Sequence, residues 1–136
     1  MGNRRLPAIL VMLLALTVGL SGCGDSSDDS GVDLSGVEFQ DLTGEDAVVV
    51  EGVDNSFRPA YIEVKAGTEV TFRNGGRANH NVLPAKTGDF KGIETTAFTP
   101  GDEATITFDE PGDRPYYCSL HGTKTKGMVG AVRVVE

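Results

Sequence analysis

Short runs in which apolar and polar residues alternate, or in which β-branched residues gather, fill the chain from residue 47 onward. They are residues 47–53, 62–65, 69–73, 104–108, 116–118 and 131–135. A period of two places one face of a strand in the core and the other in water. Glycine-rich and proline-rich turns separate the runs, and none of them keeps a helical period. The pattern therefore predicts an all-β sandwich or barrel over residues 47–136.

The N-terminus has the pattern of an export signal. Arg4 and Arg5 precede an uncharged apolar stretch, residues 6–20, which is shorter than the roughly 20 residues that a membrane-spanning helix needs. The following Leu20-Ser21-Gly22-Cys23 resembles the bacterial lipobox. We predict a lipoprotein signal peptide over residues 1–22 and a lipid on Cys23, which would hold the protein at the outer face of the cell membrane. An uncleaved anchor, or a plain secretory signal with Cys23 incidental, is the alternative.

Charge is distributed unevenly along the chain. The formal net charge is −8, and residues 24–46 hold eight acids and no base, whereas residues 47–136 hold twelve acids and ten bases. Residues 23–46 are predicted to be a lipidated cysteine followed by a flexible acidic linker, because they are rich in Ser, Gly and Asp. Val32, Leu34, Val37 and Phe39 are an exception and could add an edge strand. A nucleic-acid partner is not expected, since neutralising phosphates requires clustered Lys and Arg.

Ligand-capable side chains are few in the predicted domain. The chain has only two His, His80 and His121, and only two Cys, Cys23 and Cys118. If Cys23 carries a lipid, Cys118 has no partner within the chain, and a lone thiol in an oxidising compartment is a liability that a metal would relieve. Cys118 and His121 are three residues apart, so one loop can bring both to the same ion. His80 must come from another loop or strand.

The residue types also indicate which metal. Two His and one Cys with a weak axial Met are the ligands of a blue-copper electron-transfer site, and Met128 follows His121 by seven residues. Thiolate and thioether favour Cu(I), while imidazole suits Cu(II), so one rigid site can serve both oxidation states. A structural zinc site is the alternative, but such a site usually has a fourth strong ligand.

The same residues resemble the plastocyanin/azurin (cupredoxin) family. The run Tyr117-Cys118-Ser119-Leu120-His121, with Gly127-Met128 after it, looks like the family's C-terminal ligand pattern, and Asn79-His80-Asn81-Val82 looks like its upstream His motif. The strand pair before that His and the turn at Glu110-Pro111-Gly112 are also similar. Together the matching pieces cover nearly all of residues 47–136.

The resemblance implies an antiparallel Greek-key β-sandwich with one type 1 copper ion between the loops at one end. His80, Cys118 and His121 would be the equatorial ligands and Met128 the axial one. Asn81 would lie behind them, tying the His80 loop to the Cys118 loop. The loop between His121 and Met128 is about two residues longer than in plastocyanin-like members, and Gly122 and Gly127 could let it close.

The function implied is one-electron transfer, with the exposed edge of His121 as the electron port and no enzymatic activity. A protein donor and acceptor of electrons, membrane attachment through Cys23 and a monomeric state are expected. The alternatives are a copper-binding protein for copper handling or delivery without redox cycling, and a cell-surface binding module that does not use the metal.

Overall fold

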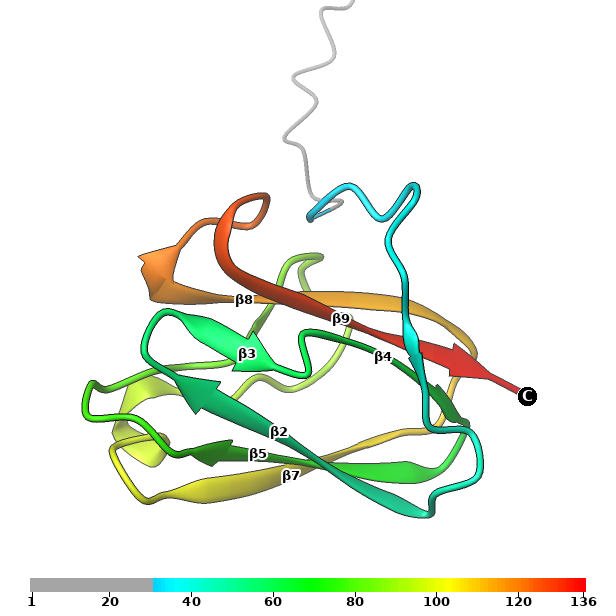
Figure 1. Ribbon diagram of the computed structural model, residues 1–136, viewed down its shortest axis with the longest axis horizontal. Helices are drawn as coiled ribbons and strands as arrows, with labels where there is room; N and C mark the ends of the chain where they lie inside the picture. The colour runs from blue at the N-terminus through cyan, green and yellow to red at the C-terminus, as the bar shows by residue number, and fades with distance from the viewer. Residues whose placement is uncertain (1–30) are drawn as a thin grey trace, which may run out of the picture.

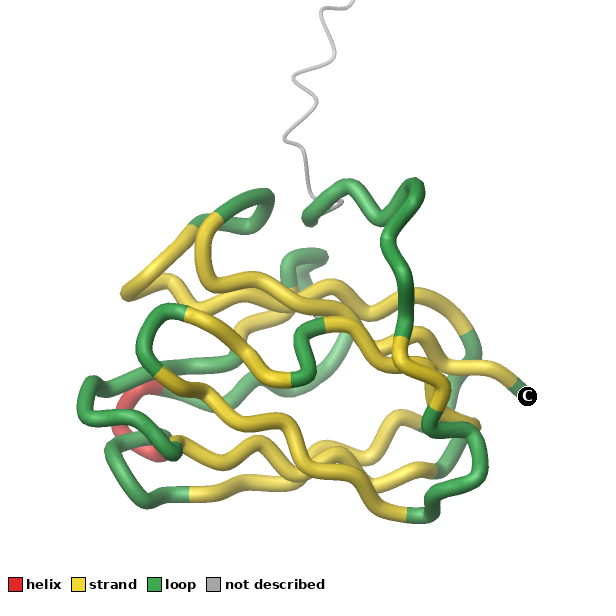
Figure 2. Tube along the Cα trace, in the orientation of Figure 1, coloured by secondary structure: helices red, strands yellow, loops and turns green. Residues whose placement is uncertain are grey.

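The computed structural model describes residues 31–136, and these residues form two packed β-sheets (Figure 1). The five-stranded sheet has the order β1-β4-β9-β8-β6, and the four-stranded sheet has the order β3-β2-β5-β7. The strands are β1 (Gln40–Asp41), β2 (Ala47–Val53), β3 (Ser56–Arg58), β4 (Tyr61–Lys65), β5 (Thr68–Asn74), β6 (Leu83–Pro84), β7 (Glu103–Phe108), β8 (Gly112–Gly122) and β9 (Gly127–Val135). A short 3₁₀ helix, η1 (Thr95–Ala97), lies in the long connection between β6 and β7 (Figure 2).

The predicted all-β sandwich is confirmed, but its sheets are mixed rather than purely antiparallel. The pairs β1–β4, β2–β5 and β4–β9 are parallel, while the other strand pairs are antiparallel. The expectation of an antiparallel sandwich is therefore wrong for these three pairs. Most neighbours in the sheets are not consecutive in the chain, because the connections cross from one sheet to the other.

The alternation seen in the sequence corresponds to the inner and outer faces of the sheets. In β2, Val48 and Val50 are buried, and in β5 the buried residues include Val70 and Phe72. Opposite them, Tyr116 packs edge-on against the ring of Phe72, with the ring centroids 5.2 Å apart. One apolar core thus joins the two sheets and extends to Cys118 and Met128.

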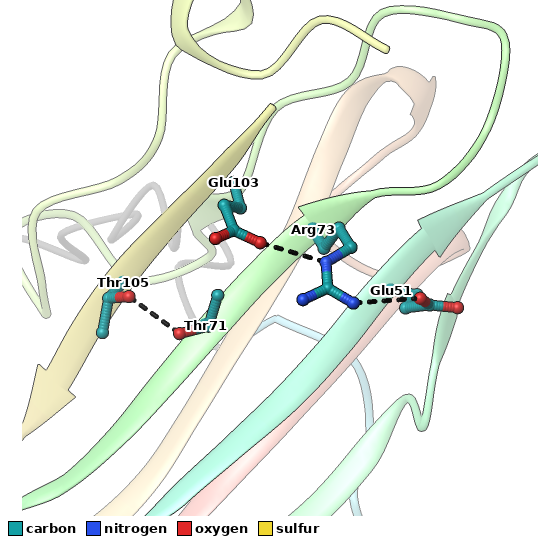
Figure 3. Close-up of polar contacts among 5 residues, drawn as sticks. All are labelled: Glu51, Thr71, Arg73, Glu103 and Thr105. Atoms are coloured by element: carbon teal, nitrogen blue, oxygen red, sulfur yellow. Dashed lines mark hydrogen bonds and ion pairs between the residues drawn. The ribbon is translucent and has the colours of Figure 1, made fainter. Parts of the chain in front are cut away.

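The outer face of the four-stranded sheet is polar along β5 and β7. Arg73 on β5 lies between Glu103 of β7, at 3.0 Å, and Glu51 of β2, at 3.9 Å (Figure 3). Beside this ladder, the hydroxyl groups of Thr71 and Thr105 share a hydrogen bond of 2.8 Å. These groups are exposed, so the ion pairs add little stability, but they account for the polar residues at alternate positions of β5 and β7.

Residues 31–46, which we call the arm, differ from the linker predicted for residues 23–46. Gln40 and Asp41 form β1 and pair in parallel with β4, and the Leu42 amide donates to the Glu63 carbonyl at 2.8 Å. Phe39 packs edge-on against Tyr61, with the ring centroids 5.9 Å apart. Backbone pairing and an aromatic contact thus attach the arm to the five-stranded sheet.

The predicted signal peptide, residues 1–22, and Cys23 lie outside the described residues. No helix within residues 31–136 is long and apolar enough to cross a membrane.

Candidate metal centre

Three ligand-capable side chains, those of His80, Cys118 and His121, meet near η1. Figure 2 shows η1 in red at one end of the sandwich. The Nδ1 atoms of His80 and His121 are 3.1 Å apart, and the Cys118 Sγ is 3.8 Å from the first and 3.6 Å from the second. His80 and Cys118 are fully buried, whereas His121 is partly exposed. Among the described residues, this is the only group of three or more His, Cys, Asp or Glu side chains that could hold a metal ion.

A break in the β8–β9 pairing brings Cys118 and His121 to the same point. The register runs regularly to Tyr117↔Val129 and resumes at Gly122↔Gly127, so residues 118–121 of β8 lie opposite Met128 alone. The extra residues must bulge away from the ladder, which turns the strand. Side chains three positions apart, which would point to opposite faces of a regular strand, can then face one ion.

His80 is positioned by a buried amide that the sequence analysis did not select. The Asn74 side chain, at the end of β5, donates to the carbonyls of Ala78 and Phe98, both at 2.9 Å. The Phe98 carbonyl also accepts from the His80 backbone amide at 3.1 Å. Asn74 therefore holds both the loop that leads to His80 and the segment to which the His80 backbone is bonded.

Asn81 links the His80 loop to the Cys118 loop, in the position that was predicted for it. Its Oδ1 accepts from the Ser119 amide at 2.8 Å, and its Nδ2 donates to the Ser119 hydroxyl at 2.9 Å. The same Nδ2 also donates to the Thr95 hydroxyl of η1 at 3.2 Å. Because the residue is buried, these bonds fix the distance between two loops that carry ligand candidates.

The chemistry of the three side chains fits a metal ion. Burial, and then the neighbouring His121, lower the pKa of His80 below its ordinary value, which favours the neutral imidazole that a metal requires. Two ring nitrogens and a thiol sulfur converge, and no carboxylate of the described residues belongs to the group. The His80 Nε2 is buried and has no hydrogen-bond partner among the described residues. A soft thiolate with two imidazoles is a donor set that suits copper.

Met128 lies next to this group. It is the first inward-facing residue of β9, and its side chain is fully buried. Met128 and His80 both lie close to Gly52. A Cβ placed on Gly52 would be 3.5 Å from the Met128 Cε, the His80 Cδ2 and the Phe98 Cε1. The Met128 methyl group and the His80 ring thus border the same small space.

A closed hairpin explains how the long His121–Met128 loop keeps Met128 near the site. Gly122 pairs with Gly127, and the Thr123 amide donates to the Lys126 carbonyl at 2.9 Å. A Cβ on Gly122 would come within 2.7 Å of the Met128 nitrogen. Gly127 has a φ of +87° and would place a Cβ 2.7 Å from the His121 carbonyl. The extra residues lie in the tip of the hairpin, between Gly122 and Gly127, so His121 and Met128 at the two ends of the loop stay close together.

The structure thus brings His80, Cys118 and His121 together, with Met128 and Asn81 beside them. Sequence reasoning missed Asn74, Phe98 and Gly52. The signal for Asn74 was present, because Asn74 follows the alternation of β5 onto the inner face, where an amide needs partners. Leu120, between the two ligand candidates of β8, has half of its surface exposed, so an apolar side chain lies in the open beside His121.

Comparison with known proteins identifies a family. Residues 45–135 match the family model described as copper binding proteins, plastocyanin/azurin family. The chain is 37% identical over 102 residues to a halocyanin of Natronomonas pharaonis, covering 71% of this chain and 61% of that protein. It is also 31% identical over 115 residues to a chloroplastic plastocyanin of Tetradesmus obliquus, covering 77% of each.

Solved structures share the fold. A reduced variant of amicyanin superimposes with a TM-score of 0.56 at 24% identity, covering 79% of this chain and 93% of amicyanin. A copper-containing nitrite reductase of Thermus scotoductus superimposes with a TM-score of 0.54 at 29% identity, covering 66% of this chain but only 22% of the reductase. The similarity to the reductase is therefore limited to one part of that larger protein.

Proposed function

Because the chain belongs to the plastocyanin/azurin family of copper-binding proteins, we propose that it is a membrane-anchored carrier of single electrons between redox partners. Its cofactor is one type 1 copper ion. The convergence of His80, Cys118 and His121 within hydrogen-bonding distances of one another carries the proposal. These three side chains would be the equatorial ligands, with Met128 axial.

Copper, when bound, supplies the one-electron couple. The chain's own contribution is a ligand cage that changes little between the two oxidation states. Asn81 ties the two ligand loops together, and Asn74 holds the His80 loop, so neither loop is free to relax when charge is gained or lost. A small rearrangement of the ligands means a small barrier to electron transfer.

The proposed route for electrons is the edge of His121. It is the only one of the three ligand candidates that is not fully buried, and the exposed Leu120 lies beside it. An apolar contact there could bring a partner close without charged groups that would hold water in the interface.

We do not propose an enzymatic activity. Both histidines of the chain belong to the one group, so no His is left to build a second copper site. The family resemblance to halocyanin, plastocyanin and amicyanin supports a carrier, and the nitrite reductase is matched over only 22% of its chain.

Attachment to the membrane through Cys23 remains a prediction from the lipobox-like Leu20-Ser21-Gly22-Cys23. Intact mass of the protein extracted from membranes tests it directly. A mass that includes a diacylglyceryl group at Cys23 supports the anchor, and an unmodified thiol or a chain that begins elsewhere contradicts it.

The electron-carrier function is tested by visible absorption of the full-length protein loaded with Cu(II) in detergent, before and after ascorbate. We expect an intense thiolate-to-copper band that bleaches on reduction and returns on oxidation. Cys118→Ser should remove the band, and Met128→Leu should keep it while shifting the reduction potential. A colourless Cu(I) complex that does not cycle would contradict the carrier and favour copper handling.

A further inference from the structure

The arm is fastened to the five-stranded sheet at two separated places. At its start, Gly31 is buried and lies so close to Ala85 and Pro115 that a Cβ would come within 2.7 Å and 2.8 Å of theirs. At its end, β1 pairs with β4, next to the ring of Phe39. Between these points the arm crosses the outer side of β8 and β9, as its cyan trace shows (Figure 1).

A stacked cation strengthens the second attachment. The guanidinium of Arg133 lies 3.9 Å from the centre of the Phe39 ring. Asp113 holds this guanidinium in place through two hydrogen bonds of 2.7 Å and 3.1 Å. The arm is therefore held by a strand pair, an aromatic contact and a cation–π contact, which act on different residues of the sheet.

This attachment shortens the distance over which a lipid on Cys23 could move the domain. Gly31 follows Cys23 by eight positions, so a fully extended chain between them spans at most about 29 Å. If residues 23–46 were all free, as the sequence predicted, the corresponding reach to residue 47 would be about 86 Å. A domain of this size has a radius of gyration of about 13 Å, so the shorter reach restricts which side can face a bilayer.

The arm begins close to the metal end. Residues 31–34 line a hollow of about 670 Å³ together with Lys86, Pro115 and Thr125. Thr125 belongs to the hairpin between His121 and Met128. An anchor that pulls on Gly31 therefore pulls on the side of the sandwich that adjoins the ligand loop.

We propose that the arm orients the domain on the membrane, with the outer side of the five-stranded sheet facing the lipid headgroups and the copper held near the bilayer surface. This inference rests on the proposed lipid anchor. It implies that the redox centre of the electron-transfer partner lies close to the membrane surface, because the copper is not carried away from the membrane on a long tether.

The test uses full-length, acylated, copper-loaded protein in phosphatidylcholine vesicles that contain a lipid with a nitroxide on its headgroup. Cu(II) nearby shortens the relaxation time of the nitroxide, and the ascorbate-reduced protein serves as the diamagnetic reference. We expect a clear shortening for the wild type. Lengthening the tether by eight residues between Ser26 and Ser27 doubles its reach and should remove most of the effect.

A pair of glycine substitutions tests the arm itself. Gly31→Val should unseat the start of the arm, because the site has no room and its φ is +80°. Gly36→Val is the control, since Gly36 has a φ of +75° but no atom within 4 Å of its Cβ position. We expect loss of the relaxation effect for Gly31→Val only, with both variants retaining the copper band.

Flotation with the vesicles separates the two proposals. If the wild type fails to float, the lipid anchor is wrong, and the orientation falls with it. If it floats, but its relaxation effect equals that of the lengthened tether, the anchor stands and the orienting role of the arm is overturned.

Discussion

In the middle of the sandwich, Phe57, Phe72 and Tyr116 pack edge to face, with ring centroids 4.9 to 6.3 Å apart. At the metal end of the same core, the buried groups include Asn74, His80 and Asn81, and directional hydrogen bonds join the two amide side chains to neighbouring loops. The centre gains stability from apolar area, which depends little on exact position. At the metal end, hydrogen bonds fix the positions of the ligand loops, although they contribute only modestly to stability. A test of either region should therefore affect stability and the copper spectrum differently.

The largest effect on the metal end is expected from Cys118→Ser. Serine is nearly the same size, so the fold should remain, but its hydroxyl cannot supply the soft thiolate ligand. We expect complete loss of the intense visible band of the Cu(II) protein with little change in far-UV circular dichroism. A band that survives in this variant would show that Cys118 is not the copper ligand.

The central core is tested by Phe72→Ala. Removing a fully buried ring from the aromatic cluster should lower the free energy of unfolding by about 3–5 kcal/mol, measured by urea denaturation of the copper-free protein. The copper band of the molecules that remain folded should keep its position. A shifted band would mean that the centre and the metal end are not independent.

Asn74→Ala should change both stability and the copper spectrum, whereas each of the preceding variants should mainly change one of them. It leaves the buried carbonyls of Ala78 and Phe98 without their donor, which should cost about 1–3 kcal/mol of unfolding free energy. Because the same contacts hold the His80 loop, the copper band should also shift. Asn79→Ala, at an exposed position of the same loop, is the control and should change neither quantity. A shift of the copper band of equal size in both variants would contradict the role of Asn74 in holding the His80 loop.

Two glycine substitutions, which should change stability least, separate the effect of backbone strain from the effect of displacing the ligand loop. Gly127 and Gly67 both have positive φ, +87° and +89°, so the backbone strain of an alanine at either should cost about 1 kcal/mol. At Gly127 the new Cβ would also press on the His121 carbonyl at 2.7 Å, whereas at Gly67 it meets open space. Only Gly127→Ala should therefore shift the copper band. Equal spectra for both variants would argue against the glycine pair as the closure of the ligand loop.

Most of the longer strands were predictable, because the alternation of buried and exposed positions is visible in short stretches of the sequence. The strand predicted over residues 47–53 coincides with β2, and the runs at 62–65 and 69–73 lie within β4 and β5. The short strands β3 and β6 were not predicted, and β1 forms just after the residues 32–39 for which an edge strand was left open. Two or three residues are too few to show a period, and such strands form only because a neighbouring strand is present to pair with them.

By itself, the sequence determined the fold class, the identity of the ligand candidates and the metal that they suit, since alternation and residue chemistry are local properties. The tertiary structure decided the parallel pairing of three strand pairs, the bulge at residues 118–121 and the seating of the arm on the five-stranded sheet. It also decided that Asn74 supports the His80 loop. Each of these depends on contacts between segments far apart in the chain, and no pattern within one segment specifies which distant surface it will meet.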